Sequence, residues 1–137
     1  MNLFSSKPLQ SYENAMVVIR VITGLSMAYH GLDVFNAKLI AEYSNWDQIK
    51  NLPMPLLWAY LGKGGELVSG ILIALGFMTR LANLVMISIM LFILFVIGKG
   101  IFWYDDQHPF LFALLGVIYF FYGGGKWSLD DYLARKG

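Results

Sequence analysis

The sequence contains no cysteine and little charge. Without cysteine the chain can form no disulfide, thiol relay, iron–sulfur cluster or cysteine-ligated zinc site. Charged residues make up 14% of the 137 residues, against roughly 25% in soluble domains. The formal net charge of +1 gives no basic surface of the kind that binds nucleic acid. The shortage of charge instead indicates a chain that folds in lipid.

What the sequence has in excess is apolar side chains. Hydrophobic residues make up 58% of the chain, above the roughly 45–50% of soluble domains, and the mean hydropathy is +0.59. Apolar runs cover about 15–35, 55–77, 81–97 and 109–122. Because about 20 apolar residues cross a bilayer as a helix, these runs predict an all-α, four-helix transmembrane bundle. We assign residues 1–14 to an N-terminal tail, 15–132 to one membrane domain and 133–137 to a C-terminal tail.

The segment between the first two runs has a pattern of its own. Leu39, Tyr43, Trp46 and Ile49 recur at spacings of three or four residues. This spacing predicts a short amphipathic helix over 36–50, lying in the membrane interface. We expect it to cover the end of the bundle that holds His30.

The distribution of lysine and arginine predicts the orientation. Four spans place both termini on one side of the membrane. Positive residues on the terminal side are Lys7, Arg80, Lys126, Arg135 and Lys136, and those on the other side are Lys38, Lys50 and Lys99. Because cytoplasmic loops carry the excess of positive charge, we expect both termini in the cytoplasm.

Ionisable side chains inside the predicted spans are the candidate site. They are Arg20, His30, Lys63 and Glu66. A charge at membrane depth costs roughly 2.5–3.5 kcal/mol, so such groups face the bundle interior and find partners there. Counting along the helices places Glu66 between Arg20 and Lys63 in depth, which predicts an Arg20–Glu66 pair with Lys63 and His30 above it.

Two interpretations of this cluster stay open. It is either a structural polar cluster that holds the first two spans in register, or a site for a quinone-like ligand, a small polar ligand or a proton.

Further candidates lie at the membrane faces: Asp33, Arg80 and His108. His30 and His108 fall on the same side, where two histidines could ligate haem, although nothing else in the sequence supports haem. The group His30, Asp33, Asp105, Asp106 and His108 gathers there too, but it has no metal-binding spacing, and we predict no metal site. The glycine-rich strings 62–70 and 123–128 lack the spacing of phosphate-binding loops.

Four short pieces of sequence carry a resemblance to a known family. In chain order they are Arg20…Gly24…His30-Gly31, Leu52-Pro53-Met54-Pro55, Glu66…Gly70…Leu75-Gly76…Thr79-Arg80-Leu81 and Gly125-Lys126-Trp127-Ser128-Leu129-Asp130. With these pieces the chain resembles the DoxX family of small four-helix membrane proteins, whose relatives include DoxD and MauE, over about residues 15–132. Lys63 and Lys99 match no feature of that family.

The resemblance implies a multi-pass protein of the bacterial cytoplasmic (inner) membrane associated with redox enzymes. We therefore expect a subunit or accessory of a quinone-linked redox system, with a quinone as the candidate cofactor. The alternatives are a carrier for a small ligand or protons, and a non-catalytic assembly or scaffold subunit. The expected partners are the bilayer, a redox or other membrane complex, and a second copy of the chain.

Overall fold

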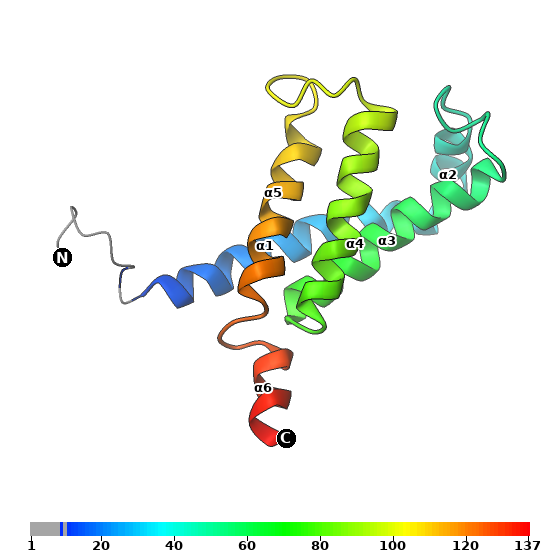
Figure 1. Cartoon of the computed structure of the whole chain (residues 1–137). Coiled ribbons are helices and arrows are strands. Elements are labelled where there is room, and N and C mark those ends of the chain that lie inside the picture. The colour runs from blue at the N-terminus through cyan, green and yellow to red at the C-terminus, as the bar shows by residue number, and fades with distance from the viewer. Residues whose placement is uncertain (1–8, 10) are drawn as a thin grey trace.

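The protein is all-helical in the part that the structure, a computed structural model, describes: residue 9 and residues 11–137. Figure 1 shows the elements in chain order. They are α1 (Tyr12–Gly31), the 3-10 helix η1 (Leu32–Phe35), α2 (Ala37–Ser44), α3 (Pro55–Leu75), α4 (Thr79–Phe92), the π-helical turn η2 (Ile93–Ile97), α5 (Gln107–Tyr122) and α6 (Leu129–Lys136). The predicted N-terminal tail lies largely outside the described residues, and α1 begins three residues before the predicted membrane domain.

Three helical segments are long and apolar enough to cross a membrane. They are Tyr12–Phe35, Pro55–Leu75 and Thr79–Ile97, within the described part of the chain. α5 is apolar as well but has only 16 residues, about 24 Å of helix. The structure therefore supports an integral membrane protein with three candidate spans and a shorter fourth apolar helix.

Small residues bring α1 and α3 into backbone contact. A Cβ atom added to Gly24 would run into Ala74 of α3, and one added to Gly70 would run into Ala28 of α1. The hydrophobic effect does not drive helices together in lipid, so their association depends on van der Waals packing. Small residues allow the close approach that such packing needs.

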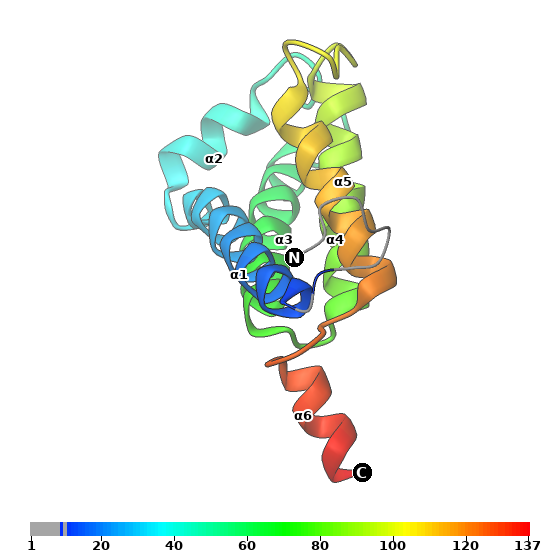
Figure 2. The ribbon, with the colours of Figure 1, turned by 90° about the vertical axis from the view of Figure 1, so that its left-hand side faces the viewer.

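The second helix pair, α4 and α5, crosses the first pair steeply (Figure 1). Figure 2 shows α1 and α3 on one side of the molecule and α4 and α5 on the other, with α6 extending away from both pairs. Between the pairs lies a small core of buried apolar residues: Met27, Ile73, Ala82, Met86, Met90 and Ala113. α3 and α4 meet at the turn before Thr79 and diverge towards their other ends (Figure 1).

The turn between α3 and α4 is tied to the C-terminal segment. Gly76 ends α3 in the left-handed conformation, with φ +65°. The Asp130 carboxylate then accepts hydrogen bonds from the backbone N–H groups of Met78 and Thr79, at 2.8 and 2.9 Å. These N–H groups lie at the start of α4 and have no partner within the helix, so Asp130 caps α4 from a distant part of the chain.

The predicted interfacial helix over 36–50 is shorter than expected. Asn36 caps α2 by accepting hydrogen bonds from the backbone of Lys38 and Leu39, but the helix ends at Ser44. The reason is local, because the side chains of Ser44 and Asn45 both donate to the carbonyl oxygen of Ala41 and compete with helical hydrogen bonds. The buried residues of this segment match the predicted stripe only in part: Ile49 is buried as predicted, but the others are Ile40 and Ser44, and Trp46 is 38% exposed.

Candidate functional site

Lys63 of α3 is the centre of a polar network between α1, α2 and α3. Its Nζ lies 2.9 Å from a carboxylate oxygen of Glu66 and 3.6 Å from one of Asp33. It also donates to the backbone carbonyl of His30, at 3.4 Å. Lys63 and Glu66 are three residues apart, so the helix itself places their side chains on one face. The structure therefore joins Lys63, Glu66 and the backbone of His30, all predicted inside the spans, with Asp33, which was predicted at the membrane face.

The network runs from the interior of the bundle towards its surface. Side-chain exposure rises from 4% at Glu66 to 20% at Lys63 and 33% at Asp33. At the outer end the Tyr43 hydroxyl donates to Asp33, at 2.6 Å. Burial and this hydrogen bond to the Asp33 carboxylate raise the pKa of Tyr43 to about 12, so the phenol keeps its proton at neutral pH.

The two histidines of the chain face each other across the helix pairs. The ring centroids of His30 on α1 and His108 on α5 are 4.9 Å apart, edge to face. His108 also packs against Phe112, with ring centroids 4.8 Å apart. This edge contact leaves no space for a porphyrin between the two imidazoles, so the pair does not fit bis-histidine haem ligation.

These polar groups line one end of a cavity between the diverging helix pairs. The cavity has a volume of about 510 Å³, and we call it the Glu66 cavity. Its polar lining includes His30, Tyr43, Lys63, Glu66 and His108. Its apolar lining includes Met27, Trp58, Ile89, Met90, Phe92 and Ile93. The space is mostly apolar, with its charges and imidazoles gathered together, which is the composition typical of small-molecule sites.

Several residues that line the cavity could not be recognised from the sequence, because only the tertiary structure places them there. Trp58 of α3 stacks on Phe92 of α4, with ring planes 5° apart and centroids at 6.0 Å. Ile93 and Ile97 belong to the π-helical turn η2, where a continuous α-helix was predicted through Ile97. π-helical turns recur at functional sites, but no local sequence signal predicted this one.

Arg20 does not belong to this site, and the predicted Arg20–Glu66 pair is wrong. Its guanidinium donates from Nη1 to the carbonyl of Gly124 and from Nη2 to the carbonyl of Trp127, the latter at 3.0 Å. Arg20 lies ten residues before His30 on α1, about 15 Å along the helix. The Arg20 side chain is therefore hydrogen-bonded to the C-terminal segment, while Glu66 forms an ion pair with Lys63.

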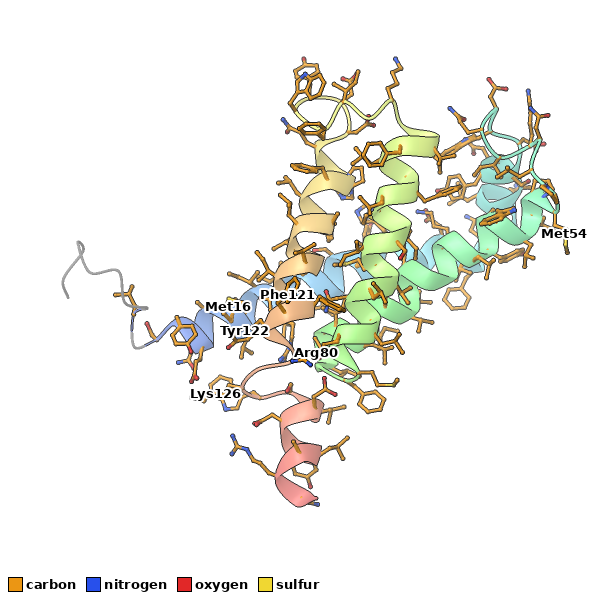
Figure 3. All side chains as sticks on the ribbon, viewed as in Figure 1. Met16, Met54, Arg80, Phe121, Tyr122 and Lys126 are labelled. Carbon is orange, nitrogen blue, oxygen red and sulfur yellow. The ribbon has the colours of Figure 1, made fainter. Side chains whose placement is uncertain are left out.

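The remaining candidates occupy other positions. Arg80 is exposed at the start of α4, and Figure 3 places it with Lys126 near the base of α4 and α5, far from Met54 at the other end of α3. Asp106 accepts hydrogen bonds from the backbone of Lys99 and Ile101, which occupies its carboxylate within the loop. In the described part of the chain, no group of three or more His, Asp or Glu side chains is arranged to hold a metal ion.

Comparison with known proteins gives one match. The family model described as DoxX matches residues 15–99, more than half of the chain, from α1 through the π-helical turn. No curated protein and no solved structure matches the chain. The matched range contains every residue of the polar network around Lys63, whereas His108 and the C-terminal partners of Arg20 lie beyond it.

Proposed function

Because this chain belongs to the DoxX family of membrane proteins, we propose that it binds a quinone in the Glu66 cavity as a subunit or accessory of a membrane redox system. The observation that carries the proposal is the distribution of polarity in that cavity. A quinone has a flat polar head with two carbonyl oxygens and an apolar tail. Lys63 and the histidines supply donors for the head, and the aromatic and aliphatic walls supply a surface for the rest.

The proposal includes a membrane arrangement. α5 serves as a fourth span beside α4, and both termini lie in the cytoplasm of a bacterial cell, since the terminal side of the chain carries more lysine and arginine. The Glu66 cavity then lies towards the outer half of the membrane, with α2 between it and the aqueous phase.

The test is a titration of the purified, detergent-solubilised chain with a short-tailed ubiquinone analogue. Trp46 and Trp58 both line the cavity, so a bound quinone should quench tryptophan fluorescence with a saturable, one-site curve. A linear, unsaturated decrease equal to that of free tryptophan in the same detergent would argue against a quinone site.

A second candidate function, a proton-coupled carrier, is favoured by the gradient of exposure from Glu66 through Lys63 to Asp33. Such a series of ionisable groups offers a route for a proton between the cavity and the surface. Liposome assays separate the two functions, because a carrier moves protons with its substrate in the absence of any electron donor. A third role, as a non-catalytic scaffold subunit, predicts stable co-purification with a large partner and no bound ligand.

A further inference from the structure

A second cavity lies at the other end of the α1–α3 pair. It has a volume of about 500 Å³, and we call it the Arg20 cavity. Eight residues of α3 separate Glu66 from Ala74, so the two cavities are about 12 Å apart along that helix. The residues that line the Arg20 cavity are Val17, Arg20 and Val21 of α1, Ala74 and Leu75 of α3, and Trp127, Ser128, Leu129 and Tyr132 of the C-terminal segment.

No carboxylate pairs directly with the charge in this cavity, although that of Asp130 acts on it from a longer distance. Arg20 is 1% exposed, and within the described residues no carboxylate lies within 4.0 Å of its guanidinium. Its two Nη groups donate to backbone carbonyls, and its Nε–H has no hydrogen-bond partner. A buried arginine cannot lose its proton, so it needs an anion to offset the loss of hydration.

The two carboxylates of the neighbouring segment, Asp130 and Asp131, bind other groups. Asp130 accepts from the backbone of Met78 and Thr79 and from the Thr79 hydroxyl. Asp131 pairs with Arg135 along α6, at 2.9 Å. Lys126 lies in the sequence between Gly124 and Trp127, whose carbonyls hold Arg20, and adds a positive charge to this segment.

Apolar side chains surround the guanidinium of Arg20 and are themselves exposed. Leu75 is 51% exposed, Leu129 41%, Tyr132 53% and Trp127 68%. Lys126 lies over the indole of Trp127, 5.1 Å from the ring centroid. An exposed aromatic residue beside a lysine is typical of the interface between lipid headgroups and acyl chains. A free phosphate would make no use of the apolar rim, whereas a phospholipid has an anion and two acyl chains.

We propose that the Arg20 cavity binds the phosphate of an anionic phospholipid, with the acyl chains along Leu75 and the exposed faces of α1 and α6. The arginine fork is suited to phosphate, because it presents several N–H donors in one plane. The bound lipid supplies an anion in direct contact with Arg20, which the described residues do not. Since the carbonyls of Gly124 and Trp127 hold the guanidinium, the lipid also fastens α6 to the membrane surface.

The experiment uses the full chain, delipidated in a neutral detergent, and measures thermal stability and lipid binding by native mass spectrometry. Phosphatidylglycerol should bind as one retained lipid and raise the Tm. Phosphatidylcholine should bind at least about tenfold more weakly, because its choline cation offsets the charge of its phosphate. Inorganic phosphate should change nothing, because it has no acyl chains to occupy the apolar rim.

Two tryptophan variants on α6 test whether the lipid occupies the cavity, one as the blocking variant and one as its control. Leu129→Trp should fill the cavity and abolish the retained lipid and the rise in Tm, whereas Leu133→Trp, on the same helix but outside the lining, should keep both. Arg20→Lys should bind less tightly than the wild type because it loses the planar fork. The proposal is overturned if phosphatidylcholine matches phosphatidylglycerol, if inorganic phosphate alone raises the Tm as much, or if Leu129→Trp retains the lipid.

Discussion

At the scale of the residue, the ion pair of Lys63 and Glu66 explains how a carboxylate is kept in the interior of an apolar bundle. The sequence places both side chains on one helix face through their spacing of three residues, although the predicted partner of Glu66 was Arg20. The partners of Arg20 could not be predicted in the same way. They are carbonyl groups of Gly124 and Trp127, more than a hundred residues away, and a backbone oxygen has no signature in the sequence.

The pair makes a prediction about stability. Lys63→Met should leave the buried Glu66 carboxylate without its cation and lower the free energy of unfolding by about 3 kcal/mol, the lower end of the range for buried pairs because Lys63 is partly exposed. The double variant Lys63→Met, Glu66→Leu should recover much of that loss, since both charges are gone. Denaturation in detergent measures both effects, and losses that simply add would contradict the pairing.

At the scale of the element, the apolar runs predicted the long helices well, because their lengths match what a bilayer demands. The end of α2 and the π-helical turn η2 were not predicted, because side-chain hydrogen bonds and packing against neighbouring helices set them. The attachment of α6 was missed for the same reason. It depends on Asp130, which in the sequence looks like an ordinary acidic residue in the first turn of an amphipathic helix.

Asp130 makes this attachment pH-dependent. Burial raises the pKa of Asp130, but hydrogen bonds from Thr79 and Met78 outweigh it, helped by the charge of Arg20, and the pKa lies below its ordinary value of 3.8. A lowered pKa in the folded state means that the stabilisation is complete above pH 3.8 and is lost as the pH falls through the lower folded value.

We expect Asp130→Asn to remove this pH dependence and to weaken the attachment by about 1.5–3 kcal/mol, the usual contribution of hydrogen bonds to a charged group. Hydrogen exchange at the amides of Met78 and Thr79 measures the attachment directly. Asp131→Asn is the control, because Asp131 pairs only with Arg135 on the exposed side of α6 in the described structure. Equal protection of the two amides in Asp130→Asn and in the wild type would show that the cap contributes nothing.

At the scale of the whole molecule, two helix pairs cross steeply (Figures 1 and 2). The Glu66 cavity lies between the pairs, and the more open Arg20 cavity lies at the other end of α3, against the C-terminal segment. Composition predicted a helical membrane domain, but the crossing could not be predicted. It follows from backbone contacts at Gly24, Gly31 and Gly70, which bring α1 and α3 together and leave α4 and α5 as a separate pair. The candidate site divides within the α1–α3 pair, with Glu66 of α3 in one cavity and Arg20 of α1 in the other.

The proposed membrane arrangement is tested by single cysteines, which the cysteine-free chain accepts without background. Asn45→Cys and Asp105→Cys, both in exposed loops, should react with a membrane-impermeant reagent added outside intact cells. Lys136→Cys should react only after the cells are opened. Labelling of Lys136→Cys in intact cells, with Asn45→Cys and Asp105→Cys both protected, would reverse the orientation. Labelling of all three in intact cells would show that α5 does not span.

The central claim is that the Glu66 cavity holds a ligand, and Gly62 offers the most direct measurement. A Cβ atom on Gly62 would meet nothing within 4 Å, and the residue lines the cavity. Gly62→Ala therefore serves as the matched control, while Gly62→Phe should fill the space without disturbing helix packing. In the quinone titration, Gly62→Ala should bind like the wild type, and Gly62→Phe should bind at least about tenfold more weakly at an unchanged Tm. Equal quinone affinity in the wild type and Gly62→Phe would contradict a ligand in this cavity.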